Sequence, residues 1–159
     1  MNTIRRYVEM QKYYYKDGFT SDTCAEGSGL LKYTAAAVTI TKGQAIHSDG
    51  SGLATNATTA FAATFLGIAA HDCTSGEALL VIPPRQNYKF WVKVESNEVL
   101  DQANVGEIVD LEANDSIDIS DTTCVAWGFH ILAIDISADA IAANTYGYAK
   151  GELVVMDQD

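Results

Sequence analysis

The chain has 159 residues, which is enough for one domain built on a single core but too few for two large domains. Apolar residues make up 48% and charged residues 19% of the chain, a balance typical of a globular protein rather than of a disordered one. The formal net charge of −11 argues against a nucleic-acid-binding protein, because neutralising phosphates requires a basic surface.

Residues 1–30 are interpreted as an N-terminal arm. Tyrosines are interleaved with cations there, and a loose stretch without helical or strand periodicity follows. Tyrosine side chains offer large, rigid contact surfaces, so we expect this arm to order on a partner; a terminus that merely packs on an edge is the alternative. The candidate partner-binding residues of the arm are Arg5, Arg6, Tyr7, Tyr13, Tyr14 and Tyr15.

Residues 31–159 are predicted to form a single β domain, because short apolar runs alternate with turn signals from there onward. Helical turns are expected at 58–64 and 137–143, where alanines replace β-branched residues. Strands are expected at 37–41, 44–47, 66–70, 78–82 and 87–95.

The strand expected at 87–95 alternates strictly between apolar and polar positions. Phe90 and Val92 share one face, whereas Lys89, Trp91 and Lys93 share the other. A tryptophan flanked by cations is typical of interface anchors, so we predict that these three residues form a second partner-binding site. A cation stacked on the indole within the same molecule is the alternative.

The two halves of the chain contain similar short motifs at a constant interval. Gly43-Gln44-Ala45-Ile46 corresponds to Gly106-Glu107-Ile108-Val109, and Ile68-Ala69-Ala70-His71-Asp72 corresponds to Ile131-Leu132-Ala133-Ile134-Asp135. The interval from Gly43 to Gly106 equals the interval from Ile68 to Ile131, and we call it the repeat offset. Two matches with one offset favour a duplicated β unit over chance similarity.

A third pair of motifs has a longer offset. Gly76-Glu77 and Gly151-Glu152 are each interpreted as a turn before an apolar strand, but they lie further apart than the repeat offset. The extra residues before Gly151 contain the expected helix at 137–143. We therefore predict pseudo-repeat halves at about 36–95 and 100–159, which together close one compact β-barrel or sandwich.

The strands and turns of residues 36–82 also follow a family pattern. Gly43-x-x-Ile46 is followed by Gly67-Ile68-Ala69, and then by Gly76-Glu77 with an apolar strand behind it. In this order of motifs the chain resembles the capsid decoration proteins of tailed phages, also called cement or head-stabilising proteins. In residues 104–156 the resemblance survives only through the internal repeat.

This resemblance implies a structural virion protein. The family members are compact β-barrels that form homotrimers on the outer surface of the capsid and bridge neighbouring major capsid subunits. The implied partners are the major capsid protein and further copies of this chain, and the implied location is the virion exterior after synthesis in the host cytoplasm. Residues 94–159 depart from the family pattern, because they carry one lysine against fourteen acidic residues.

No catalytic centre can be assembled from the sequence, so we expect a protein that is not an enzyme, without catalytic, cofactor-binding or metal-binding residues. His71 and Asp72 are adjacent, and adjacent side chains on a strand point to opposite faces. Asp115, Asp118 and Asp121 suggest calcium, but their spacing is not that of a helix-loop-helix calcium site.

The alternative function is a non-catalytic β-sandwich carbohydrate-binding module with Tyr88, Trp91 and Tyr146 as its aromatic platform. No membrane association is expected. The charged start of the chain lacks the apolar run of a signal peptide, and the longest apolar stretch, 61–70, is too short to span a bilayer.

Overall fold

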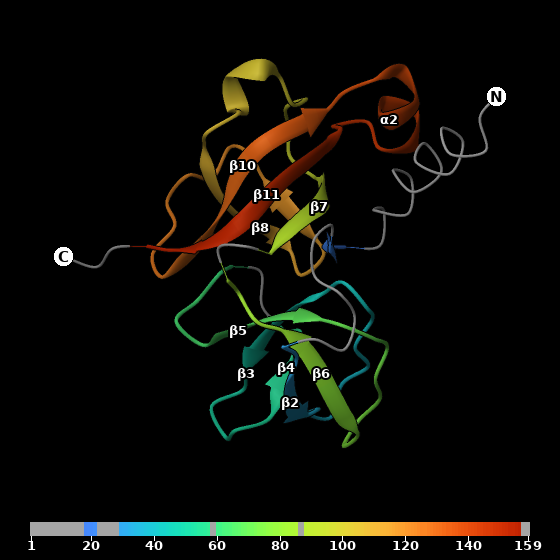
Figure 1. The fold of residues 1–159 in the computed structure, drawn as a ribbon, viewed down its shortest axis with the longest axis vertical. Helices are drawn as coiled ribbons and strands as arrows, with labels where there is room; N and C mark the ends of the chain where they lie inside the picture. The colour runs from blue at the N-terminus through green and yellow to red at the C-terminus, as the bar shows by residue number, and fades with distance from the viewer. Residues whose placement is uncertain (1–17, 22–28, 58–59, 86–87, 157–159) are drawn as a thin grey trace.

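A computed structural model describes residues 18–21, 29–57, 60–85 and 88–156 of the chain. Within these ranges the protein consists mainly of β-strands, arranged in two sheets that Figure 1 shows one above the other. The expected mainly β fold is therefore confirmed.

The first sheet is formed by residues of the first half of the chain, and we call residues 29–85 the first unit. Its strands lie in the order β2-β6-β5-β3-β4, with antiparallel neighbours throughout. A parallel bridge between Ala35 and Ala54 draws its two edge strands together. The strands are β2 (Leu31–Thr34), β3 (Ala45–Ser48), β4 (Ala54–Thr55), β5 (Phe65–Ala69) and β6 (Ala78–Ile82).

The second sheet belongs to residues 88–156, which we call the second unit, and it is joined by the short strand β1 (Thr20–Ser21). Its strands lie in the order β1-β7-β11-β10-β8-β9, and β9 also pairs in parallel with the end of β7, which closes five strands into a barrel. The elements are β7 (Lys89–Val94), η2 (Gln102–Asn104), β8 (Ile108–Ala113), β9 (Ser116–Asp118), β10 (Trp127–Asp135), α2 (Ala138–Ala143) and β11 (Tyr148–Val155).

The two units share one topology. Strands β2 to β6 have the same order and the same parallel closure as strands β7 to β11, so the duplication inferred from the repeat offset is present in the fold. Each unit forms a sheet of its own, and the barrel closes within the second unit. The matching backbone hydrogen bonds run from the N–H of Ala35 to the oxygen of Glu77, from Val94 to Gly147, from Ala36 to Ala54, and from Glu95 to Ile117.

The turns agree with the repeat at one place and contradict it at another. Gly43 and Gly106 both adopt a positive φ, 92° and 98°, immediately before β3 and β8. The turn predicted at Gly151-Glu152 is wrong, because both residues lie inside β11. Glycine is required at position 151 for a different reason, since an added Cβ would lie 2.0 Å from the carbonyl oxygen of His130 on β10.

Two further expectations concern local structure. The helix at 137–143 forms as α2, and the Ser137 side chain accepts a hydrogen bond from the N–H of Ala140 as its cap. The other expected helical turn, 58–64, does not form within its described part, residues 60–64; Thr58 and Thr59 lie outside the described residues. Phe61 is instead buried in the core, and it is followed by a single non-helical turn in which the N–H of Phe65 donates to the carbonyl oxygen of Ala62.

The strand expected at 87–95 forms as β7, but it pairs with β11 and β9 of the second unit rather than with strands of the first half. The change from one unit to the next therefore lies before Tyr88. A strand that alternates on one face can join any sheet with a free edge, so the alternation identified the strand but not its partners.

One hydrophobic cluster joins the two units. It contains Phe61 and Phe65 of the first unit together with Phe90 and Phe129 of the second. Phe19, which lies within the expected arm of residues 1–30, is only 3% exposed and lies among them, with ring centroids 5.6 to 6.2 Å from those of Phe61, Phe90 and Phe129. Residues 18–21 are thus part of the folded domain, and Phe19 packs against side chains of both units.

Candidate functional site

The outer face of β7 carries the predicted strand site. Phe90, Val92 and Val94 are fully buried, whereas Lys89, Trp91 and Lys93 lie on the opposite face and are each half-buried. The structure therefore brings the three predicted residues together on one face of one strand. Their surroundings determine how much of that face is available to a partner.

Trp91 is stacked within the molecule. Lys150 of β11 lies directly opposite Trp91 in the strand register, and its ammonium nitrogen is 6.0 Å from the centroid of the indole ring. Such contacts contribute roughly 0.5 to 1 kcal/mol at exposed sites. The intramolecular alternative raised by the sequence is thus what the structure contains, although the cation comes from the neighbouring strand and not from Lys89 or Lys93.

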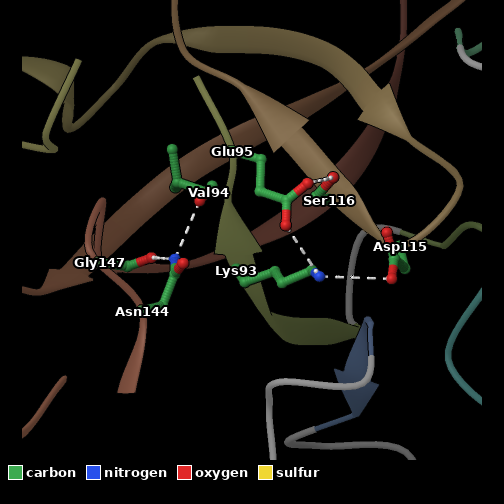
Figure 2. A network of polar contacts seen from close by, with 7 residues as sticks. All are labelled: Lys93, Val94, Glu95, Asp115, Ser116, Asn144 and Gly147. Atoms are coloured by element: carbon green, nitrogen blue, oxygen red, sulfur yellow. Dashed lines mark hydrogen bonds and ion pairs between the residues drawn. The ribbon is translucent and has the colours of Figure 1, made fainter. Parts of the chain in front are cut away.

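Lys93 is held by two carboxylates, as Figure 2 shows. Its Nζ lies 3.0 Å from an oxygen of Glu95 and 3.4 Å from an oxygen of Asp115. Burial by itself would lower the pKa of Lys93, but the hydrogen bond to Glu95 and the negative charges of Asp115 and Glu95 outweigh it and raise the pKa. Lys93 therefore stays protonated, and its ion pair with Asp115 links β7 to the turn before β9.

The same corner of the barrel contains a hollow of about 310 Å³ between the ends of β7, β8 and β9 and the segment that follows α2. Asn144 shapes its rim, because its side-chain amide donates to the carbonyl oxygens of Val94 and Gly147 (Figure 2). The lining is polar and consists of Glu95, Ser96, Asn97, Glu112, Asp118, Ser120, Asn144, Thr145 and Tyr146.

The acidic side chains around this hollow have local partners. Burial and the neighbouring Asp118 raise the pKa of Glu112, and Asp118 accepts hydrogen bonds from the backbone and hydroxyl of Ser120. Asp121 is bound in the same way by Thr123. Among the residues that the structure describes, no group of three or more His, Cys, Asp or Glu side chains could hold a metal ion.

His71 and Asp72 serve a turn of the first unit. The Nε2 atom of His71 accepts the N–H of Leu80 at 3.0 Å, so its Nδ1 carries the proton and donates to the carbonyl oxygen of Asp72. The carboxylate of Asp72 accepts the N–H of Lys42 at 2.8 Å. The two side chains therefore bind different segments.

The structure also contains a pair of buried polar residues that the sequence analysis missed. His47 on β3 and Asp110 on β8 occupy equivalent positions, separated by the repeat offset, and they hold one loop from both units. The Nε2 atom of His47 accepts the N–H of Ala62, and Oδ1 of Asp110 accepts the N–H of Phe61 at 2.7 Å. Burial lowers the pKa of His47 to about 4, so the imidazole is neutral at pH 7.

The repeat offset itself was the signal for this pair. When the offset is added to the position of His47 it gives Asp110, so a polar residue occupies the equivalent position in each of two apolar strands. Their shared role could not be read from the sequence, because the loop that they hold is far from Asp110 along the chain.

Other predicted residues are dispersed or lie elsewhere. Tyr88 and Tyr146 are partly buried against the main hydrophobic cluster, and Arg85 stacks on the Tyr88 ring, whereas Trp91 lies on the outer face of β7. The structure does not gather the three into one platform. The arm residues Arg5, Arg6, Tyr7, Tyr13, Tyr14 and Tyr15 lie outside the described residues.

No family model matches the chain, and no curated protein is similar to it. Within the described ranges, no helix is both long enough and apolar enough to cross a membrane.

Proposed function

We propose that the protein is a structural virion protein that binds the outer surface of a phage capsid as a trimer and stabilises the shell by bridging major capsid subunits. The motif order of residues 36–82 first suggested this role. The structure contributes an observation of its own, which is the division of charge between the two units.

The charge asymmetry of the sequence is an asymmetry between two bodies. The first unit, residues 29–85, contains three Lys or Arg and three Asp or Glu, a net charge of zero. The second unit, residues 88–156, contains three Lys and twelve Asp or Glu, a net charge of −9. Figure 1 shows these units at opposite ends of the molecule. This division of charge supports a protein that docks through its neutral end and exposes its acidic end to solvent.

The junction between the units supports a binding role for the N-terminal arm. Gly18 and Phe19 lie at this junction, where the N–H of Phe19 donates to the carbonyl oxygen of Gly43 and β1 pairs with β7. Gly18, the first described residue of the chain, therefore lies beside the shared core. A partner that holds this arm would be connected directly to both units.

Cosedimentation with shells assembled from the matching major capsid protein tests the proposal. The full chain should cosediment, raise the temperature at which the shells break, and scatter light as a trimer. A chain that lacks residues 1–17 keeps Phe19 and β1, so it should fold with unchanged stability and bind at least about tenfold more weakly.

Two results would contradict this proposal in different ways. A full chain that stays in the supernatant rejects the capsid role, whereas full binding without residues 1–17 rejects only the arm. Saturable binding of an oligosaccharide by a monomer would favour the carbohydrate-binding alternative.

A further inference from the structure

We propose that the edge of β2 in the first unit accepts an extended strand of a partner polypeptide, antiparallel to β2 and anchored by a large apolar side chain. This inference goes beyond the proposed function, because it concerns one sheet edge and requires no shell.

The backbone of β2 has an open side. Leu31 and Tyr33 pair with Val81 and Leu79 of β6, and the N–H of Ala35 continues this ladder to Glu77. In an antiparallel pair, the residues between such hydrogen-bonded positions direct their N–H and C=O groups to the other side. Those groups of Lys32 therefore point out of the sheet, and among the described residues no strand pairs with them. The open stretch ends at Thr34, because the parallel bridge between Ala35 and Ala54 turns the carbonyl oxygen of Thr34 toward β4.

The second unit shows the same edge with an occupant. The matched hydrogen bonds of the two units align Ala35 with Val94, so Lys32 corresponds to Trp91 and Leu31 to Phe90. At that edge Thr20 of β1 pairs with Trp91 and Ser21 with Phe90, in antiparallel orientation. The chain itself thus displays the kind of segment that this edge takes.

The matching apolar residues beside the two edges differ in exposure, as expected if one edge is paired with a strand and the other is not. Phe90 is fully buried, and the ring of Phe19, the residue before β1, covers it edge-on at 6.1 Å. Leu31 faces the same side of its strand as the buried Leu79 and Val81, yet it is 41% exposed. An apolar side chain placed as Phe19 is placed would cover Leu31.

Open strand edges are templates for pairing with another chain, in which backbone hydrogen bonds supply affinity and side-chain pockets supply selectivity. The occupant of this edge therefore needs an apolar residue followed by at least two residues free to pair, which is the pattern Phe19-Thr20-Ser21.

A synthetic peptide of residues 15–23 is the probe, added to the ¹⁵N-labelled full chain and followed by amide NMR signals. We expect saturable shifts at Leu31 and Lys32 and slowed hydrogen exchange at Lys32. The same peptide with Phe19→Ala should bind at least about tenfold more weakly, since it lacks the anchor.

Two protein variants distinguish binding through the backbone N–H of residue 32 from binding through its side chain. Lys32→Pro removes the outward N–H without touching a hydrogen bond to β6, and it should weaken peptide binding at least about tenfold. Lys32→Thr keeps that N–H and should bind within about twofold of the unsubstituted protein. Leu31→Ser, which should also weaken binding, provides a second test if Lys32→Pro perturbs the fold.

Several results would overturn the inference. They are the absence of saturable shifts at millimolar peptide, equal binding by Lys32→Pro and Lys32→Thr, and shifts confined to Phe90 and Trp91, which would mean that the peptide displaces β1. Self-association of the protein that is lost in Lys32→Pro would assign the edge to a second copy instead.

Discussion

Replacing His47 with glutamine should change how the stability of the protein depends on pH. The imidazole is completely buried beside the Phe65 ring, and its burial lowers its pKa from 6.5 to about 4. The unfolded chain takes up a proton near pH 6.5, whereas the folded protein resists protonation down to about pH 4. The free energy of unfolding contributed by His47 is therefore fully present above pH 6.5 and is lost as the pH falls toward 4.

The difference between the two pKa values sets the size of the effect. Each unit of pKa difference corresponds to about 1.36 kcal/mol, so the full loss is about 3 kcal/mol, of which about 2.5 kcal/mol has occurred at pH 4.5. Other groups also titrate in acid, because hydrogen bonds lower the pKa values of Asp49 and Asp121, but these groups are common to both proteins.

Urea unfolding followed by tryptophan fluorescence measures the effect. Glutamine has no titrating group yet offers an acceptor for the N–H of Ala62, so His47→Gln should be the less stable protein at pH 7.5. Between pH 7.5 and pH 4.5, the free energy of unfolding of the unsubstituted protein should fall by about 2.5 kcal/mol more than that of His47→Gln. If the two stability curves run parallel between these pH values, the imidazole is not held neutral by burial and the reasoning fails.

Five further substitutions, two of them controls, test the junction and the barrel by the same unfolding assay. Phe19→Ala should cost about 3 to 5 kcal/mol because it empties a site among three phenylalanines, whereas Val99→Ala at a half-exposed position should change the free energy of unfolding by less than about 0.5 kcal/mol. Asp110→Ala should cost about 2 to 3 kcal/mol because it strands the buried N–H of Phe61, and Asp110→Asn, which retains an acceptor oxygen, should recover at least half of that loss; equal losses would refute the role of the hydrogen bond. Gly151→Ala should destabilise by more than about 3 kcal/mol, since its Cβ would meet the backbone of His130; a near-neutral result would show that β10 and β11 can separate there.

Several local elements of this protein could be predicted because their signals are local, but the strand expected at 37–41 is wrong, since only Ile40 forms an isolated bridge there. Alternation with a period of two identified β7 and the face on which Trp91 lies, and the alanine-rich segment 137–143 predicted α2. The repeat offset pointed to the duplication, and it holds for the turns before β3 and β8. It does not hold for β5 and β10, because Ile131 of β10 has the hydrogen bonds that Ala69 of β5 has in the first unit, so these two strands match one residue away from the expected register.

The expectations that failed depended on neighbours far away in the chain. The Gly76-Glu77 turn has no counterpart at Gly151. Glycine is needed at position 151 because the backbone of β10 leaves no room for a side chain there, and not because the chain turns. Phe61 was expected in a helical turn, but its side chain is buried in a cluster drawn from both units.

The sequence by itself determined that the chain is mainly β, that it contains two similar units, and that its charge is gathered at one end. Only the tertiary structure decided that β7 joins the second unit, that Lys150 covers Trp91, and that Phe19 belongs to the core. The reason is physical: the residues along a strand determine which face is apolar, whereas the strand that pairs with it is selected by long-range packing that no short stretch of sequence encodes.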